Sequence, residues 1–314
     1  MVKLNDIEIR RVAVIGAGTI GASWAAYFLA RGLDVTVSDP APDARDKVAR
    51  HIDRAWPTLE KLGLAPDASA DRWRFQADPS AAADGADFCQ ESAPERYEIK
   101  IELLRRLDRA LPREVVLASS SSGLLISRLQ EHCNYAERLV IGHPFNPPHI
   151  VPLVEVVGGF KTAQATIATA MEFYRAIGKH PIEIRREVPG HLANRLQAAL
   201  WREAVHLVAE GVATVEDVDA AISDGPGLRW ALMGPHLTLA LAGGEGGMAH
   251  FLDHLGPAMT GWWDSLGTPK LTDEVKQKLV AGVEAETHGR SIAELERERD
   301  AFLVSVLAAR RGTR

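Results

Sequence analysis

A histidine and a glutamate stand twelve residues apart in the stretch of the chain best suited to chemistry. His143 ends one apolar run and Glu155 lies within a second, with prolines at 144, 147 and 148 near the start of the link between them. Both runs are typical of β-strands, so we expect the chain to reverse at the prolines. A buried carboxylate without a partner would cost several kcal/mol, and the histidine lies across the turn. A histidine oriented by a buried carboxylate is a general base near neutral pH, although the pair could also be purely structural.

A glycine-rich turn lies upstream, between an apolar run at 11–15 and a helix-forming segment at 22–30. Glycines spaced G-x-G-x-x-G allow a tight turn, let the backbone approach a pyrophosphate and let the helix pack on the strand. The helix N-terminus then offers its N–H groups to the phosphates. We therefore expect the residues of this turn to bind a dinucleotide: Gly16, Gly18, Thr19, Ile20 and Gly21.

An aspartate, Asp39, ends the next strand-like segment at 34–38. It lies about 20 residues after the glycines, where a carboxylate would bind a ribose 2′-hydroxyl. The carboxylate would repel the 2′-phosphate of NADP, and residues 40–43 contain no arginine to bind one. The predicted cofactor is therefore NAD, with a helix cap as the alternative role for Asp39.

Four serines, at 119–122, directly follow a predicted strand at 114–118. Their hydroxyls could bind a substrate oxygen and the cofactor amide, and some of them should cap the next helix. We favour Ser122 as the functional one. A Ser-His-Glu hydrolase is the competing interpretation, but the run lacks the G-x-S-x-G elbow, and a hydrolase has no use for a dinucleotide turn.

The elements that must position these residues alternate between strands and helices throughout the first half. Besides those already named, helices are predicted at 41–63, 80–85, 95–111 and 125–132, and strands at 73–76 and 87–91. This alternation predicts a parallel, doubly wound sheet. Ligands bind such sheets at the carboxyl ends of the strands, which here carry the glycine turn, Asp39, Glu91, the serines and His143. We expect these groups to share one crevice.

The second half of the chain reads as helix after a break at Pro189-Gly190. The expected helices lie at 192–209, 214–222, 235–242, 248–255, 272–286 and 291–309. The predicted fold is therefore α/β, with an N-terminal doubly wound domain over 1–187 and an all-helical C-terminal domain over 188–314. Asn194 lies among apolar residues early in the first of these helices. Its amide could donate to a substrate oxygen or bond to backbone, and the sequence leaves both open.

Length and composition set outer limits on the function. The chain has 314 residues, which suits two domains, and its net charge of −6 argues against a nucleic-acid partner. Its two cysteines, Cys89 and Cys133, fit a reducing cytosol and lack metal-ligand spacing, so we expect no metal site. No apolar stretch reaches ~18 residues and the N-terminus lacks a signal-peptide pattern, so we expect a cytoplasmic protein without a membrane partner.

The motifs together resemble the L-3-hydroxyacyl-CoA dehydrogenase superfamily from about residue 10 to residue 310. The resemblance is carried by the glycine turn, Glu91 with Glu95 and Lys100, the four serines, His143-Pro-Phe-Asn-Pro, Val154-Glu155-Val156 and Pro189-Gly-x-x-x-Asn194-Arg195. It implies a Rossmann domain with NAD, followed by a helical dimerisation domain that makes a homodimer. It also implies roles: His143 as catalytic base, Glu155 as its orienting partner, Ser122 and Asn194 as donors to the substrate oxygen, and Glu91, Glu95, Lys100 and Ser120 near the cofactor.

The chain departs from the CoA-using members of this superfamily at two places. Ser120 replaces the Asn of their usual Ser-Asn-Thr-Ser run, and the stretch 227–235 differs from their Gly-Tyr-Pro-Met-Gly-Pro pattern. Both departures are similar to the branch that acts on free hydroxy acids such as carnitine and gulonate. Within that branch, the segments at 201–204, 229–230, 242–248 and 291–296 are most similar to the members that oxidise carnitine.

Three residues of the second half bear on the choice of substrate. A quaternary ammonium is recognised by aromatic faces, which Trp201 and Trp230 could provide, and Arg229 could pair with a substrate carboxylate. The tryptophans could instead pack a core or a dimer interface. The sequence thus predicts NAD-dependent oxidation of the 3-hydroxyl of a small L-3-hydroxy acid, with carnitine favoured over gulonate or a 3-hydroxyacyl-CoA. A structural or sensing protein that binds NAD without turnover is the non-enzymatic alternative.

Overall fold

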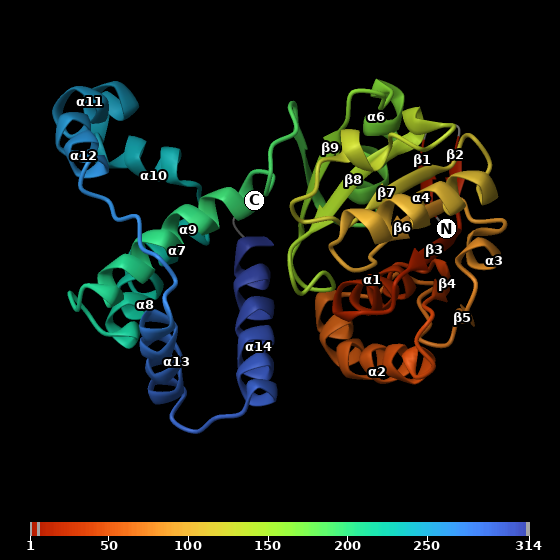
Figure 1. The fold of residues 1–314 in the computed structure, drawn as a ribbon, viewed down its shortest axis with the longest axis horizontal. Helices are drawn as coiled ribbons and strands as arrows, with labels where there is room; N and C mark the ends of the chain where they lie inside the picture. Colours follow the sequence, from red (N-terminus) through yellow and green to blue (C-terminus); the bar gives the residue numbers. More distant parts are fainter. Residues whose placement is uncertain (1, 5–6, 312–314) are drawn as a thin grey trace. The chain divides into compact units, whose positions relative to one another are not determined.

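The computed structural model describes residues 2–4 and 7–311, and it divides after Arg195 into two compact units (Figure 1). The sequence placed this division at residue 187. The difference arises because residues 191–194 hydrogen-bond to the strands and loops of the first unit. Among the described residues, no helix has the length and apolar character needed to cross a membrane.

The first unit is built on an eight-stranded sheet in the order β10-β9-β8-β7-β6-β3-β4-β5. The strands are β3 Arg11–Ile15, β4 Asp34–Ser38, β5 Trp73–Gln76, β6 Phe88–Glu91, β7 Val116–Ser119, β8 Leu139–Pro144, β9 Leu153–Gly158 and β10 His180–Ile184. All neighbours are parallel except β8 and β9, which are antiparallel, as the proline-rich reversal predicted. The sequence did not predict β10, nor the small hairpin of β1 (Val2–Leu4) and β2 (Ile7–Ile9).

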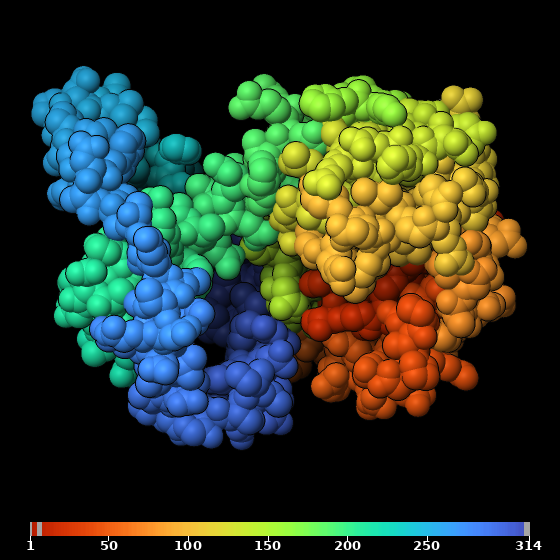
Figure 2. All heavy atoms as spheres, viewed as in Figure 1, coloured from red at the N-terminus to blue at the C-terminus, as the bar shows by residue number. Residues whose placement is uncertain are grey.

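Helices cover both faces of this sheet. They are α1 Thr19–Ala30, α2 Ala44–Leu62, α3 Pro79–Ala83, α4 Tyr97–Ala110, α5 Ile126–Leu129 and α6 Gln164–Ala176, with a 3-10 turn at Ala136–Arg138. Along β3, Val12 and Val14 belong to the buried cluster under α1, α2 and α6, whereas Ala13 and Ile15 belong to the cluster under α3, α4 and α5. This alternation between two covered faces confirms the doubly wound sheet. In the space-filling view, the side chains of α4 and its neighbouring loops hide much of the sheet (Figure 2).

The second unit is helical, as predicted. Its elements are most of α7 (Ala193–Ala209), which begins in the first unit, then α8 Val215–Ser223, α9 Pro226–Trp230, α10 Pro235–Ala242, α11 Gly247–His254, α12 Gly256–Trp263, α13 Asp273–Thr287 and α14 Ile292–Arg311. The start of α8 is fixed by a capping box, in which the Thr214 hydroxyl accepts from Asp217 N and the Asp217 carboxylate accepts from Thr214 N. The short helices α9 and α12 were not predicted from the sequence.

Candidate active site

The predicted histidine–glutamate pair forms directly across the antiparallel strands β8 and β9. His143 and Glu155 are register partners, and His143 Nδ1 lies 2.8 Å from Glu155 Oε2. Both side chains are buried. The second carboxylate oxygen, Oε1, accepts from the backbone N–H groups of Leu192 at 2.9 Å and Ala193 at 2.8 Å. A carboxylate only accepts, so Nδ1 carries a proton and Nε2 is left as a proton acceptor.

The electrostatic balance at Glu155 favours its charged form. Burial alone would raise the pKa of this carboxyl, but the hydrogen bonds from His143, Ala193 and Leu192 outweigh it, so the pKa lies below its ordinary value. Glu155 is therefore an anion at neutral pH. An anion at Nδ1 stabilises the imidazolium that forms when Nε2 takes a proton, which is what a general base requires.

Glu95 organises the turn formed by the four serines. Its Oε1 accepts from the Ser121 hydroxyl at 2.7 Å, the Ser122 N–H at 2.8 Å and the Gly123 N–H at 2.9 Å, with the Ser122 hydroxyl at 3.2 Å. Asn194 Nδ2 donates to the Ser122 carbonyl at 3.1 Å. Ser122 and Asn194 thus meet at one turn, and the backbone bond that the sequence left open for Asn194 is present. Their roles toward a substrate oxygen stay predictions.

Glu91 and Lys100 form a buried ion pair beneath this turn. Lys100 Nζ lies 2.8 and 3.0 Å from the two oxygens of Glu91, which also accepts from the Ser119 hydroxyl and from Ala93 N at 2.6 Å. Ser120 sits beside them, with its hydroxyl 2.9 Å from that of Ser92. Ser92 and Ala93 line the cavity described next, so the pair supports the wall of that cavity from behind.

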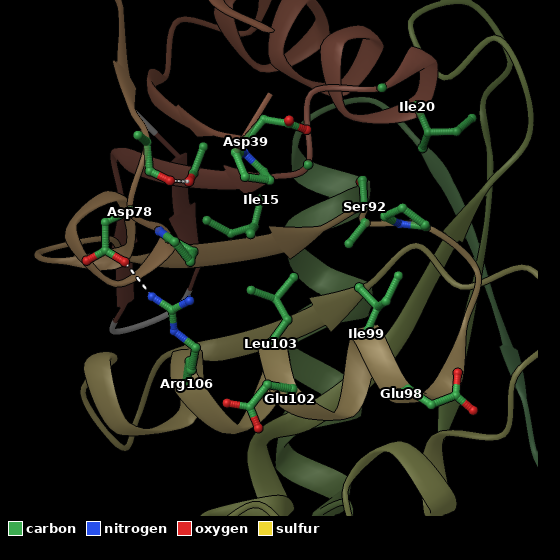
Figure 3. Close-up of a pocket in the computed structure, with 18 of the residues that line it drawn as sticks. Ile15, Ile20, Asp39, Asp78, Ser92, Glu98, Ile99, Glu102, Leu103 and Arg106 are labelled. Carbon is green, nitrogen blue, oxygen red and sulfur yellow. Dashed lines mark hydrogen bonds and ion pairs between the residues drawn. The ribbon is translucent and has the colours of Figure 1, made fainter. Parts of the chain in front are cut away.

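A cavity of about 850 Å³ opens at the carboxyl ends of β3, β4 and β6. Four residues of the glycine turn and Asp39 line it: Gly16, Gly18, Thr19, Ile20 and Asp39. Glu91, the four serines and His143, which we expected in the same crevice, are not part of its lining. Asp39 and Ile20 face it from one side, and Ile99, Leu103 and Arg106 of α4 from the other (Figure 3). The α4 residues were not predicted from the sequence, nor was Asp78, which pairs with Arg106 at 2.6 Å. The apolar spacing of Ile99 and Leu103 on one helix face was their sequence signal.

The glycine turn has the backbone that a dinucleotide needs. Gly16 has a φ of +105°, and a Cβ on Gly21 would lie 1.8 Å from the Gly16 carbonyl oxygen, so neither position tolerates a side chain. A Cβ on Gly18 would instead enter open space at the cavity, where a phosphate group can approach the bare backbone. No side chain caps the N-terminus of α1, which leaves its N–H groups for an anion. These residues fit NAD.

Asp39 binds the glycine turn as well as lining the cavity. Its Oδ2 accepts from Ala17 N at 2.8 Å and its Oδ1 from Ala41 N at 2.9 Å. The N-cap of the following helix α2 is Asp43, so Asp39 is not that helix cap. Its carboxylate remains at the cavity edge, where the 2′-hydroxyl of NAD is compatible and a 2′-phosphate is not.

The three predicted substrate residues belong to the second unit. Arg229 and Trp230 are neighbours at the end of α9, and both are exposed. Trp201, on α7, lines a groove of about 510 Å³ together with aliphatic side chains of α7, α8 and α13. Those surroundings favour the packing alternative for Trp201, and the substrate roles of all three stay predictions.

Comparisons with known proteins identify the family to which the chain belongs. A protein-family model described as 3-hydroxyacyl-CoA dehydrogenase, NAD binding domain, matches residues 11–188. The model of the C-terminal domain of the same family matches residues 190–281. A Streptomyces coelicolor protein named L-carnitine dehydrogenase is 55% identical over 96% of this chain and 95% of its own. A Pseudomonas putida protein of the same name is 48% identical, over 96% and 94%. A solved 5-formyl-3-hydroxy-2-methylpyridine 4-carboxylic acid 5-dehydrogenase, described as an NAD+-dependent dismutase, is 34% identical with a TM-score of 0.84, covering 97% and 99%.

Proposed function

Because the chain belongs to the 3-hydroxyacyl-CoA dehydrogenase family and is an NAD-dependent oxidoreductase acting on CH–OH groups, we propose that it oxidises the 3-hydroxyl of L-carnitine to the 3-oxo acid. The observation that carries the proposal is the contact of His143 Nδ1 with Glu155 Oε2, which leaves Nε2 as a base. The high identity to proteins named L-carnitine dehydrogenase supports this substrate over gulonate or a CoA ester.

In the proposed mechanism, His143 Nε2 accepts the proton of the substrate 3-hydroxyl. Glu155 stabilises the resulting imidazolium through Nδ1, and Ser122 and Asn194 donate hydrogen bonds to the substrate oxygen. The glycine turn and Asp39 hold NAD, which supplies the hydride acceptor. The roles of Glu91, Glu95, Lys100 and Ser120 are to shape the loops that face this cofactor.

The substrate's two charged ends are recognised by the second unit in this proposal. Arg229 is exposed and makes no ion pair within the described part of the chain, so its guanidinium is free to bind a carboxylate bidentately. The indole of Trp230 is 40% exposed and offers a face to a trimethylammonium group, which has no hydrogen to donate. Trp201, the other aromatic residue predicted for the substrate, lines an aliphatic groove and is the weaker candidate. A substrate carrying both groups matches carnitine.

The functional assembly proposed is a homodimer in the cytoplasm. Large apolar side chains of the second unit lie exposed, including Trp262 at 61%, Trp263 at 64% and Phe302 at 65%. A second copy of the chain, packed against these helices and the groove beside Trp201, would remove them from water. Free thiols at both cysteines fit a reducing compartment.

A substrate panel tests the function. NADH formation is measured with L-carnitine, D-carnitine, L-gulonate, L-3-hydroxybutyrate and a 3-hydroxyacyl-CoA at equal concentrations of enzyme and NAD. We expect the highest kcat/KM with L-carnitine. With D-carnitine we expect no NADH formation above background, because its C3 hydrogen would point away from the hydride acceptor. A higher kcat/KM for another acid would replace carnitine as the substrate, and no turnover of any acid would end the dehydrogenase assignment.

A further inference from the structure

His191 has a backbone conformation that is uncommon for a residue other than glycine. It is 1% exposed and its φ is +51°, immediately after Gly190 at +77°. A non-glycine residue in the left-handed region costs energy and persists only where its surroundings hold it there. His191 occupies an unspecified position of the Pro-Gly-x-x-x-Asn motif, so the family resemblance assigns it no role.

Contacts of this residue and its neighbours join two parts of the candidate site. His191 Nε2 lies 2.9 Å from the Ser121 carbonyl oxygen, which can only accept, so Nε2 carries the proton. The left-handed turn then directs the next two backbone N–H groups, those of Leu192 and Ala193, at Glu155 Oε1. One residue therefore links the serine turn to the carboxylate that orients the base.

The ring of His191 also stands close to that base. Its centroid is 5.3 Å from the centroid of His143. Burial lowers the pKa of His191, and His143 lowers it further, against the opposing effects of the Ser121 carbonyl, Glu155 and Glu95. The ring is therefore neutral near pH 7, and it does not repel an imidazolium at His143. Its Nδ1 is buried without a hydrogen-bond partner among the described residues.

We propose that His191 is a positioning residue, whose Nε2–H holds the serine turn in register with the His143–Glu155 pair. Ser122 then reaches the substrate oxygen from which His143 takes the proton. The part concerning the substrate oxygen rests on the proposed function, whereas the tethering of the turn does not. Small displacements of aligned groups lower kcat steeply, so the hydrogen bond matters more for turnover than for binding.

The test compares two substitutions of His191 in the full-length enzyme. Phenylalanine (His191→Phe) keeps an aromatic ring and removes the donor, whereas glutamine (His191→Gln) keeps an N–H at the same distance along the side chain. We expect His191→Phe to lower kcat ~10- to 100-fold with little change in KM for NAD, and His191→Gln to stay within about threefold of wild type. In the plot of kcat/KM against pH, the fall on the acid side should occur at the same pH as in wild type, because the replaced ring is neutral.

His149→Phe is the matched control, since it replaces another buried histidine, which is hydrogen-bonded to Ser23 on α1. Its kcat should be near wild type.

Hydrogen–deuterium exchange gives a readout that does not depend on the substrate. Amides of residues 119–124 should exchange faster in His191→Phe than in wild type and remain protected in His191→Gln, with β3 unchanged in both. The inference is overturned if His191→Phe keeps wild-type kcat and protection, if glutamine rescues neither, or if His149→Phe loses as much kcat. Should the wild type oxidise none of the acids, the proposed function fails, and the exchange data alone decide whether His191 tethers the turn.

Discussion

The two units of the chain differ most in where their apolar side chains lie. The first unit buries two large clusters, one on each face of the sheet, with Trp24 and Phe28 in one and Leu104 and Leu107 in the other. In the second unit, few large side chains are buried, and tryptophans and leucines lie exposed along its helices. A sheet covered on both faces completes its own core, whereas helices with exposed apolar faces need another surface to cover them. The residues proposed to carry out proton transfer all lie in the first unit, which completes its own core.

Replacing the proposed base, His143, has the largest expected effect and tests whether catalysis depends on the first unit. We expect His143→Ala to lower kcat by ~10² to 10⁴, because general-base catalysis is lost while the cavity for NAD remains. Stopped-flow or steady-state NADH formation measures kcat, and intrinsic fluorescence measures NAD affinity. A near-normal kcat would show that a residue other than His143, in either unit, acts as the base.

A charge placed in the second unit's groove tests its need for a partner. Val280 lines that groove and is exposed on α13. Because a buried unpaired charge costs several kcal/mol, Val280→Asp should weaken dimerisation by ~100-fold or more. Sedimentation velocity across a dilution series measures the effect.

Gln277→Asp is the matched control, because Gln277 is exposed on the same helix and does not line the groove. This substitution should leave the dimer intact. If wild type is already monomeric, or if Val280→Asp remains as dimeric as Gln277→Asp, the exposed apolar surface has another purpose.

Hydrogen-bonded carboxylates of the two units should contribute differently to stability. Glu155 has a lowered pKa, so its stabilising effect is complete above pH 4.5, the ordinary value, and is lost as the pH falls through the lower pKa of the folded state. Near neutral pH, Glu155→Gln should therefore reduce the free energy of unfolding by ~1–3 kcal/mol, and this deficit should shrink in acid. Urea denaturation at several pH values measures it.

Asp273→Asn is the control from the second unit. Its partner Lys276 is also exposed, so the loss of this ion pair should change the free energy of unfolding by less than ~1 kcal/mol. Equal and pH-independent effects of the two substitutions would contradict the difference between the units.

The substrate role assigned to the second unit predicts the smallest effect. Trp230→Leu should raise KM for L-carnitine by roughly 2- to 30-fold, the range of a cation–π contact, and leave KM for NAD unchanged. The control substrate is an uncharged isostere of carnitine, in which a tert-butyl group replaces trimethylammonium; its turnover should not depend on Trp230. An unchanged KM for carnitine removes Trp230 from the substrate site.

Local patterns in the sequence determined much of this protein. The alternation of strands and helices predicted the doubly wound sheet, and the glycine spacing with Asp39 predicted the dinucleotide cavity. His143 and Glu155 could be paired in advance because prolines between two adjacent strands force a short antiparallel reversal, which leaves few possible registers. Each of these inferences depends on residues close together in the chain or on a fixed period.

Only the tertiary structure decided which distant groups complete the site. Glu95 holds the serine turn from the loop that precedes α4, Arg106 and Asp78 line the cavity from separate elements, and His191 reaches Ser121 across 70 residues of sequence. No local period encodes such contacts. They depend on how the strands order in the sheet and on a left-handed backbone at His191, which is uncommon for a residue other than glycine and which no local pattern predicts.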